Sequence, residues 1–244
     1  MFIGHYAPAL ALKTLRKSPN LAACFVAVQL VDIGFFSLAY FGIERWRPDA
    51  GLAGIMPVDL YYMPFTHSLL GSAIWALAAG GVTFAWVPKG RKRVGAAIIL
   101  ALVFSHWLLD LVVHRHDLGL LGDGPHKLGF GLWNLPAVEM PLEIALVVTG
   151  FFFYLSSTRP RGVWGRRFPW IALASLLGLQ AINWFAPPPS GAAAFSGLGL
   201  FAYFACVALA WGLDRTREPR PGREFEKPRP DTQTTAHAAS STSG

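Results

Sequence analysis

Residues 101–117, with the sequence ALVFSHWLLDLVVHRHD, constrain this chain most, because they combine an apolar helix of membrane type with ionisable side chains. His106 and Asp110 are four residues apart and His114 follows four residues later, so all three lie on one face of a helix. An ionisable side chain in the hydrocarbon region costs about 2.5–3.5 kcal/mol on insertion scales and normally faces partners inside the protein. The stretch therefore predicts a polar site within a membrane-spanning bundle.

The composition indicates an all-α integral membrane protein. Of its 244 residues, 53% are hydrophobic and only 14% are charged, whereas soluble domains carry about 25% charged residues. Both cysteines fall in apolar segments, which argues against a disulfide framework. We expect a short N-terminal half-helix followed by about six transmembrane helices, over residues 21–43, 68–87, 95–114, 137–156, 168–186 and 194–213.

The chain divides into four parts by hydropathy and charge. Residues 1–20 are predicted to form the half-helix, 21–156 a four-helix core with the polar site, 157–214 two supporting helices, and 215–244 a disordered cytoplasmic tail. Basic residues gather before the first span, after the second, after the fourth and after the sixth. The positive-inside rule assigns these segments, and both ends of the chain, to the cytoplasm. The excess of 21 Lys and Arg over 14 Asp and Glu thus indicates topology, with membrane lipid as the expected partner and no nucleic acid.

Several residues in the first four spans favour a metal site. Asp32 lies near the middle of the first span, His67 at the outer mouth of the second, and His106 and Asp110 in the outer half of the third. Imidazole and carboxylate ligands suit zinc, with manganese as an alternative. These spans contain no Lys or Arg, so a bound dication would neutralise their buried carboxylates. We therefore expect these four residues, with His5 as a fifth candidate, to hold a divalent metal ion.

Two of these residues have other interpretations, which stay open. Asp32 could serve a proton relay, and Thr66-His67-Ser68 could simply cap the second span. His5 would lie about 12 Å deep from the cytoplasmic face, whereas His67 is nearer the opposite face. Either the loop before the second span folds inward or His5 is not a ligand.

A pair of acidic residues, Glu139 and Glu143, lies at the outer start of the fourth span. The two are four residues apart and share a helix face. They could form a solvated first turn, where the helix dipole favours acids. Alternatively, either carboxylate could act as the general base at the mouth of a metal site.

Four motifs occur in order along the chain: Gly4-His5, Val31-Asp32-Ile33, FTHSLL at 65–70 and SHWLLD at 105–110. With them, roughly the first 115 residues resemble the predicted membrane-bound metal-dependent hydrolases, a family that includes a LexA-regulated bacterial inner-membrane protein. That family is similar to zinc-dependent phospholipase C and to the single-strand-specific zinc nucleases. The resemblance implies a multi-pass protein of a bacterial-type inner membrane. It also implies zinc-ligand roles for His5, Asp32, His67, His106 and Asp110.

The chain departs from the family pattern in two places. The family's P-D-x-D-H is V-D-I-G-F here, and its H-R-G before T-H-S is M-P-F. One or two metal ions are therefore expected in place of three.

The leading hypothesis for function is a metal-dependent hydrolase of phosphoesterase type. A site in the outer half of the membrane favours a phosphoester of a lipid or a lipid-linked substrate at the outer leaflet, with Glu139 or Glu143 as general base. A proton- or metal-ion-coupled transporter or channel is one alternative, in which the His/Asp stripe is an ion pathway. A non-catalytic membrane protein with a structural metal is the other.

Overall fold

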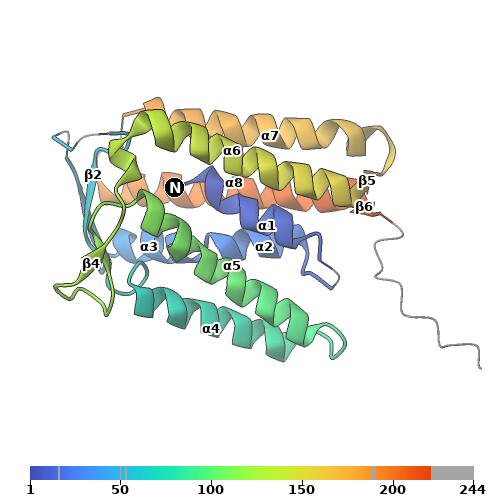
Figure 1. Ribbon diagram of the computed structural model, residues 1–244, viewed down its shortest axis with the longest axis horizontal. Coiled ribbons are helices and arrows are strands. Elements are labelled where there is room, and N and C mark those ends of the chain that lie inside the picture. The colour runs from blue at the N-terminus through green and yellow to red at the C-terminus, as the bar shows by residue number, and fades with distance from the viewer. Residues whose placement is uncertain (16, 50, 53, 188, 190, 221–244) are drawn as a thin grey trace, which may run out of the picture.

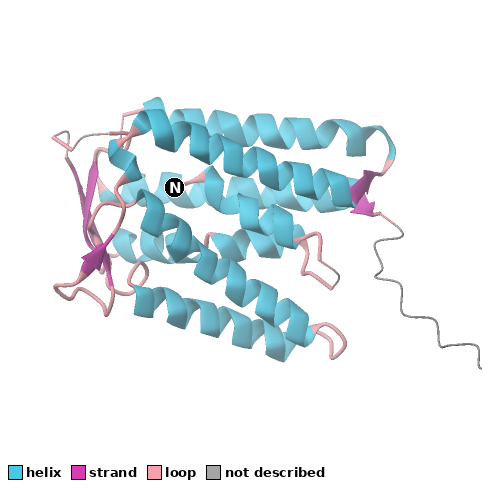
Figure 2. Ribbon diagram, in the orientation of Figure 1, coloured by secondary structure: helices cyan, strands magenta, loops and turns pink. Residues whose placement is uncertain are grey.

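In the computed structural model, long helices run side by side along one direction (Figures 1 and 2). The structure describes residues 1–220 except 16, 50, 53, 188 and 190. Its elements are η1 (Ile3–His5), α1 (Tyr6–Leu12), α2 (Leu21–Val28), α3 (Leu30–Tyr40), β1 (Arg45–Pro48), β2 (Val58–Tyr62), α4 (Leu69–Trp86), α5 (Lys92–Val113), β3 (Leu118–Gly119), β4 (Lys127–Leu128), η2 (Leu132–Asn134), α6 (Pro136–Ser157), β5 (Thr158–Pro160), α7 (Gly162–Phe185), α8 (Ala192–Thr216) and β6 (Arg217–Pro219).

The helices agree with an all-α membrane protein. Among the described residues, α4 to α8 are each long and apolar enough to cross a membrane, and α2 with α3 forms a sixth span if the bent pair is counted as one. Large apolar side chains such as Phe152, Phe201 and Trp211 are exposed along these helices, as expected where the surroundings are lipid. The predicted fold class is confirmed.

Short strands lie at both ends of the bundle, where the sequence predicted none. The antiparallel pairs β1–β2 and β3–β4 form the end that we call the hairpin end, and β5–β6 lies at the other, the clasp end (Figure 2). At the clasp end, Glu218 accepts a hydrogen bond from Arg161 and pairs with Arg159, and these contacts lower the pKa of its carboxyl group. The predicted tail therefore starts later than residue 215, because α8 and β6 extend to Pro219; residues 221–244 lie outside the described part.

The first span is not the continuous helix that its hydropathy predicts. α2 and α3 are bent by 56° at Gln29, whose φ of −107° and ψ of 9° leave the helical region. The Gln29 side chain is buried, and its Nε2 donates a hydrogen bond to the carbonyl of Phe2 at 3.0 Å. The break places Asp32 in the first turn of α3 and frees the last carbonyls of α2 for other donors.

The N-terminal half-helix enters the bundle from the clasp end, with its N-terminus in the interior (Figure 1). α1 packs against α6, and Gly150 permits the close approach, since a Cβ there would lie 2.8 Å from Cα of Ala7. Around α1 the core is apolar and includes Leu10, Leu102 and Val147. α1 thus brings the N-terminal residues, including His5, to the hairpin half of the bundle.

Candidate metal centre

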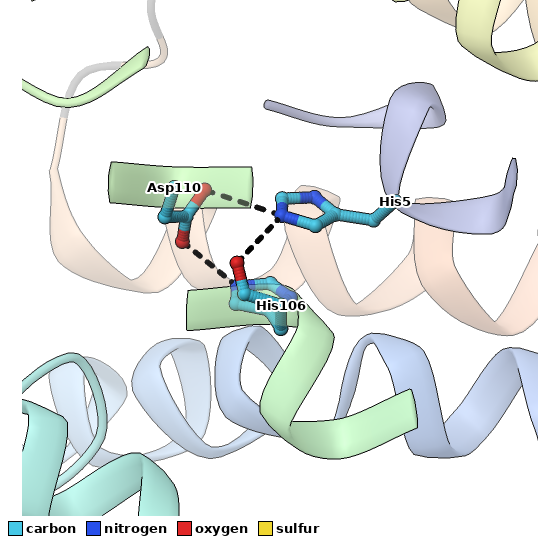
Figure 3. A group of neighbouring side chains, drawn as sticks. All are labelled: His5, His106 and Asp110. Carbon is cyan, nitrogen blue, oxygen red and sulfur yellow. Dashed lines mark hydrogen bonds and ion pairs between the residues drawn. The ribbon is translucent and has the colours of Figure 1, made fainter. Parts of the chain in front are cut away.

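The five residues predicted to bind a metal lie together in the hairpin half of the bundle. His5 comes from η1, Asp32 from α3, His67 from the loop before α4, and His106 and Asp110 from α5. Asp110 Oδ1 lies 3.2 Å from His5 Nε2, and its Oδ2 lies 3.0 Å from His106 Nε2 (Figure 3). Asp32 Oδ1 lies 3.2 Å from His67 Nε2 and 3.6 Å from His106 Nε2. The Asp32 side chain is 14% exposed, whereas those of the other four are at most 3% exposed.

An inward fold of the loop before α4 brings His67 to this cluster. The buried carboxylate of Glu44 accepts hydrogen bonds from the backbone N–H groups of Phe65 and Thr66 at 2.9 and 3.0 Å, and from the Thr66 hydroxyl at 2.6 Å. Ser68 caps α4 by accepting a hydrogen bond from the N–H of Gly71. The capping interpretation thus holds for Ser68, while His67 points to the site, so the inward-folding alternative is the one that the structure adopts.

His67 and His106 each have a hydrogen-bond partner at Nδ1. The Thr66 hydroxyl donates to Glu44, so at 2.9 Å it accepts from Nδ1 of His67. Nδ1 of His106 donates to the carbonyl of Val28, one of the carbonyls that end α2, at 2.8 Å. These partners leave the Nε2 lone pairs of both rings facing the Asp32 and Asp110 carboxylates.

His114 extends the cluster beyond the predicted set. Its Nδ1 lies 2.9 Å from Asp117 Oδ1, and its Nε2 lies 3.7 Å from Asp110 Oδ2. The four-residue spacing from Asp110 was a signal for this contact, but His114 stands just past the end of α5, where a loop could have turned it away. Loop 129–131 prevents this, because the N–H of Gly131 donates to the carbonyl of His114 at 2.7 Å.

The arrangement has the properties of a cation site. Lone pairs of imidazole nitrogens face carboxylate oxygens, and the buried Nε2 of His106 has no hydrogen-bond partner within the described residues. Such acceptors repel one another unless a proton or a metal ion lies between them. Three triads can each offer ligand atoms within 4.8 Å of one another: His5–His106–Asp110, Asp32–His67–His106 and His67–Asp110–His114. Nitrogen and oxygen donors of this type fit zinc or a similar divalent ion.

The two glutamates differ in their surroundings although both are buried, so a solvated first turn of α6 is wrong. Glu143 accepts hydrogen bonds from the N–H groups of Phe2 and Gly4, the latter at 3.0 Å, and from Nε2 of Gln180 at 2.8 Å. Both carboxylate oxygens of Glu139 have no hydrogen-bond partner within the described residues. Glu143 therefore holds the N-terminal turn in place, and Glu139 is the carboxylate available for other chemistry.

The two supporting helices also contribute to the site, which the sequence did not indicate. The Tyr203 hydroxyl of α8 donates a hydrogen bond to Asp32 Oδ2 at 2.6 Å, and Gln180 of α7 binds Glu143. The amino group of Met1 lies 3.3 Å from Asp110 Oδ1. In the sequence, Gln180 and Tyr203 are single polar side chains within apolar helices, and nothing there indicates which residues they contact.

A comparison of this chain with protein-family models, curated proteins and solved structures finds no match. Its functional interpretation therefore depends on the geometry and chemistry of the buried cluster.

Proposed function

We propose that the buried His/Asp cluster holds a divalent metal, zinc or manganese, and that the protein is a membrane-embedded metal-dependent hydrolase. The observation that supports this most is the orientation of the imidazoles: Nδ1 of His67 and His106 is bound elsewhere, so their Nε2 lone pairs face Asp32 and Asp110. Metal-binding histidines typically have such a partner on the other ring nitrogen. The sequence motifs that resemble membrane-bound metal-dependent hydrolases agree with this proposal.

The residues around the cluster suit hydrolysis of a phosphoester. When bound, a divalent ion lowers the pKa of water toward about 7 and polarises a phosphoryl oxygen. Glu139 is buried and its oxygens have no hydrogen-bond partner within the described residues, so we assign the general-base role to Glu139 and not to Glu143. Asp32, with 14% of its side chain exposed, marks the least enclosed part of the cluster.

The position of the cluster favours a lipid or lipid-linked substrate. Asp110 lies three residues before the end of α5, and Glu139 is the fourth residue of α6, so both are about 5 Å inside the helix ends. That depth corresponds to the region just below the lipid headgroups. With the basic clasp end in the cytoplasm, the cluster belongs to the outer leaflet of a bacterial-type inner membrane.

A transporter is less well supported by the surroundings of the cluster. The core around α1 and α2 is mainly apolar, with Leu10, Leu21, Leu102 and Val103 among its side chains, and it contains no buried Asp, Glu, Lys, Arg or His among the described residues. An ion pathway would require polar or ionisable groups through this core. A structural metal remains the competing explanation, and the activity measurement below separates it from a hydrolase.

The metal content of the detergent-purified protein is the first test. We expect about one or two equivalents of zinc or manganese in the wild type, by mass spectrometry, and their loss in His106→Ala and Asp110→Ala, because each removes a ligand from two of the triads. His126→Ala, which alters an exposed loop histidine, is the matched control and should retain the metal. A folded wild type that takes up no added metal would contradict the proposal.

Turnover of a fluorescent phospholipid phosphoester in mixed micelles tests the hydrolase part. We expect Glu139→Gln to retain the metal and lose about 10²–10⁴-fold in kcat, the usual contribution of a general base. Metal binding without turnover of any phosphoester, in wild type as well as variant, would identify the metal as structural.

A further inference from the structure

An open apolar groove lies on the outside of the bundle beside the buried cluster. Ala7, Pro8 and Ala11 of α1 form its floor, Leu109 of α5 forms one wall, and the face of α6 from Leu142 to Phe153 forms the other. Its volume is about 300 Å³. Nothing in the hydrolase proposal above uses this groove.

The groove exists because small side chains meet where the half-helix fits between α5 and α6. Gly150 brings α1 close to α6, and Ala145 adds only a methyl group on the same face. Ala7 and Ala11 are equally small. Larger side chains at these positions would close the groove, so the space follows directly from the sequence of α1 and α6.

The groove begins beside the cluster and runs away from it along α6. Leu109 directly precedes Asp110, and Leu142 directly precedes Glu143, so the walls of the groove are the outward faces of the helices that carry the site. From Leu142 to Phe153 the groove extends about 16 Å toward the clasp end, at 1.5 Å per residue. It thus starts about 9 Å inside the hairpin end of α6, at Leu142, and ends about 6 Å inside the clasp end, at Phe153.

The surface around the groove belongs to the lipid-facing belt of the protein. Val148, Phe152 and Leu108 beside it are 45%, 68% and 49% exposed, on helices that cross the membrane. The groove is continuous with this belt, so its occupant comes from the bilayer. A helix about 10 Å wide would occupy roughly 1,200 Å³ over the same length, far more than the groove holds, whereas an extended hydrocarbon chain is narrow enough to enter.

We propose that the groove binds one acyl chain of a membrane phospholipid. In this position the polar end of the lipid lies at the level of Asp110 and Glu139, and the chain follows α6 inward. That this lipid is also the substrate rests on the hydrolase proposed above, whereas its binding in the groove does not. The substrate class would then be an acyl-bearing phospholipid that enters sideways from the outer leaflet.

Photo-crosslinking tests this proposal in lipid nanodiscs of phosphatidylethanolamine and phosphatidylglycerol that contain a phospholipid with a diazirine in its acyl chain. α1 is the informative segment, because Ala9 and Leu10 are fully buried, whereas Ala7, Pro8 and Ala11 line the groove. We expect peptide mass spectrometry to find label on residues 7–11. Ala145→Trp fills the groove and should reduce this label about tenfold, whereas Val148→Trp on the lipid-facing side of the same helix should not.

The outcomes separate the groove from the hydrolase. Unchanged α1 label in Ala145→Trp, no α1 label in the wild type, or a dimer whose contact covers Ala145 would overturn the groove proposal. If thermal unfolding shows that Ala145→Trp does not fold, Ala145→Leu replaces it as the variant that fills the groove. Metal content is measured on the same samples: a labelled α1 without metal refutes the hydrolase alone, and a metal-loaded protein without α1 label refutes the groove alone.

Discussion

Tyr203 illustrates how single residues outside the predicted ligand set determine the geometry of the cluster. Its hydroxyl donates a 2.6 Å hydrogen bond to Asp32 Oδ2, which leaves Oδ1 directed at His67 and His106. Asp32 is the least buried member of the cluster, so it has the most freedom to turn away. A hydrogen bond to the second polar atom of a ligand side chain therefore fixes the direction of the atom that faces the site.

Tyr203→Phe removes this hydrogen bond and little else. We expect metal affinity to fall about 10–100-fold, the usual effect of losing a group that orients a metal ligand. Competition with a chromophoric chelator measures the change, and Tyr61→Phe, which alters an exposed side chain on β2, is the control. Equal affinities in wild type and Tyr203→Phe would contradict an orienting role.

At the scale of elements, the site depends on how α1 packs against α6. α1 has only seven residues, too few to be stable alone, so its position comes from tertiary contacts. Glu143 accepts hydrogen bonds from the N–H groups of Phe2 and Gly4, just before α1, and Gly150 permits close contact with Ala7. With α1 in this position, His5 Nε2 lies 3.2 Å from Asp110 Oδ1.

Gly150→Ala should therefore destabilise the protein. A Cβ there would lie 2.8 Å from Cα and 3.0 Å from O of Ala7, so α1 must move outward, at a cost of about 1–3 kcal/mol. Thermal unfolding in detergent should show a midpoint lower by several degrees.

Gly178→Ala on α7 is the matched control, since nothing lies within 4 Å of its Cβ position. Its higher helix propensity should leave stability unchanged or raise it by up to about 1 kcal/mol. If both variants behave alike, the contact of Gly150 with α1 does not hold the half-helix in place.

At the scale of the whole molecule, the two ends of the bundle differ in charge and in structure. The hairpin end carries β1–β4 and lies nearer the buried cluster, while the basic segments lead into and out of the clasp end. The positive-inside rule predicts that the clasp end faces the cytoplasm.

Cysteine labelling tests this orientation. Leu121, 75% exposed, lies at the hairpin end, and Gly90 lies in the turn between α4 and α5 near the clasp end. On intact cells, a membrane-impermeant maleimide should label Leu121→Cys but not Gly90→Cys until the cells are permeabilised. Cys24 and Cys206 are fully buried and should contribute no background. The reverse pattern would place the cluster on the cytoplasmic side.

The sequence alone was sufficient for the spans, apart from the bend within the first, and for much of the candidate site. Hydropathy is a local property, so six spans and a half-helix could be recognised without knowledge of their packing. An ionisable side chain in an apolar helix needs a partner wherever it lies. This requirement identified Asp32, His106 and Asp110 as site residues from the sequence. The structure brings these residues together with His5 and His67, as the spacing and the motifs indicated.

Only the tertiary structure decided how those residues face one another. The bend at Gln29, the inward loop at His67 and the contact from Tyr203 join residues far apart in the chain. The different surroundings of Glu139 and Glu143 have the same origin, because one carboxylate meets the N-terminal turn and the other does not. Periodicity states which side of a helix is polar, whereas the direction of each ring nitrogen depends on neighbours that packing alone supplies.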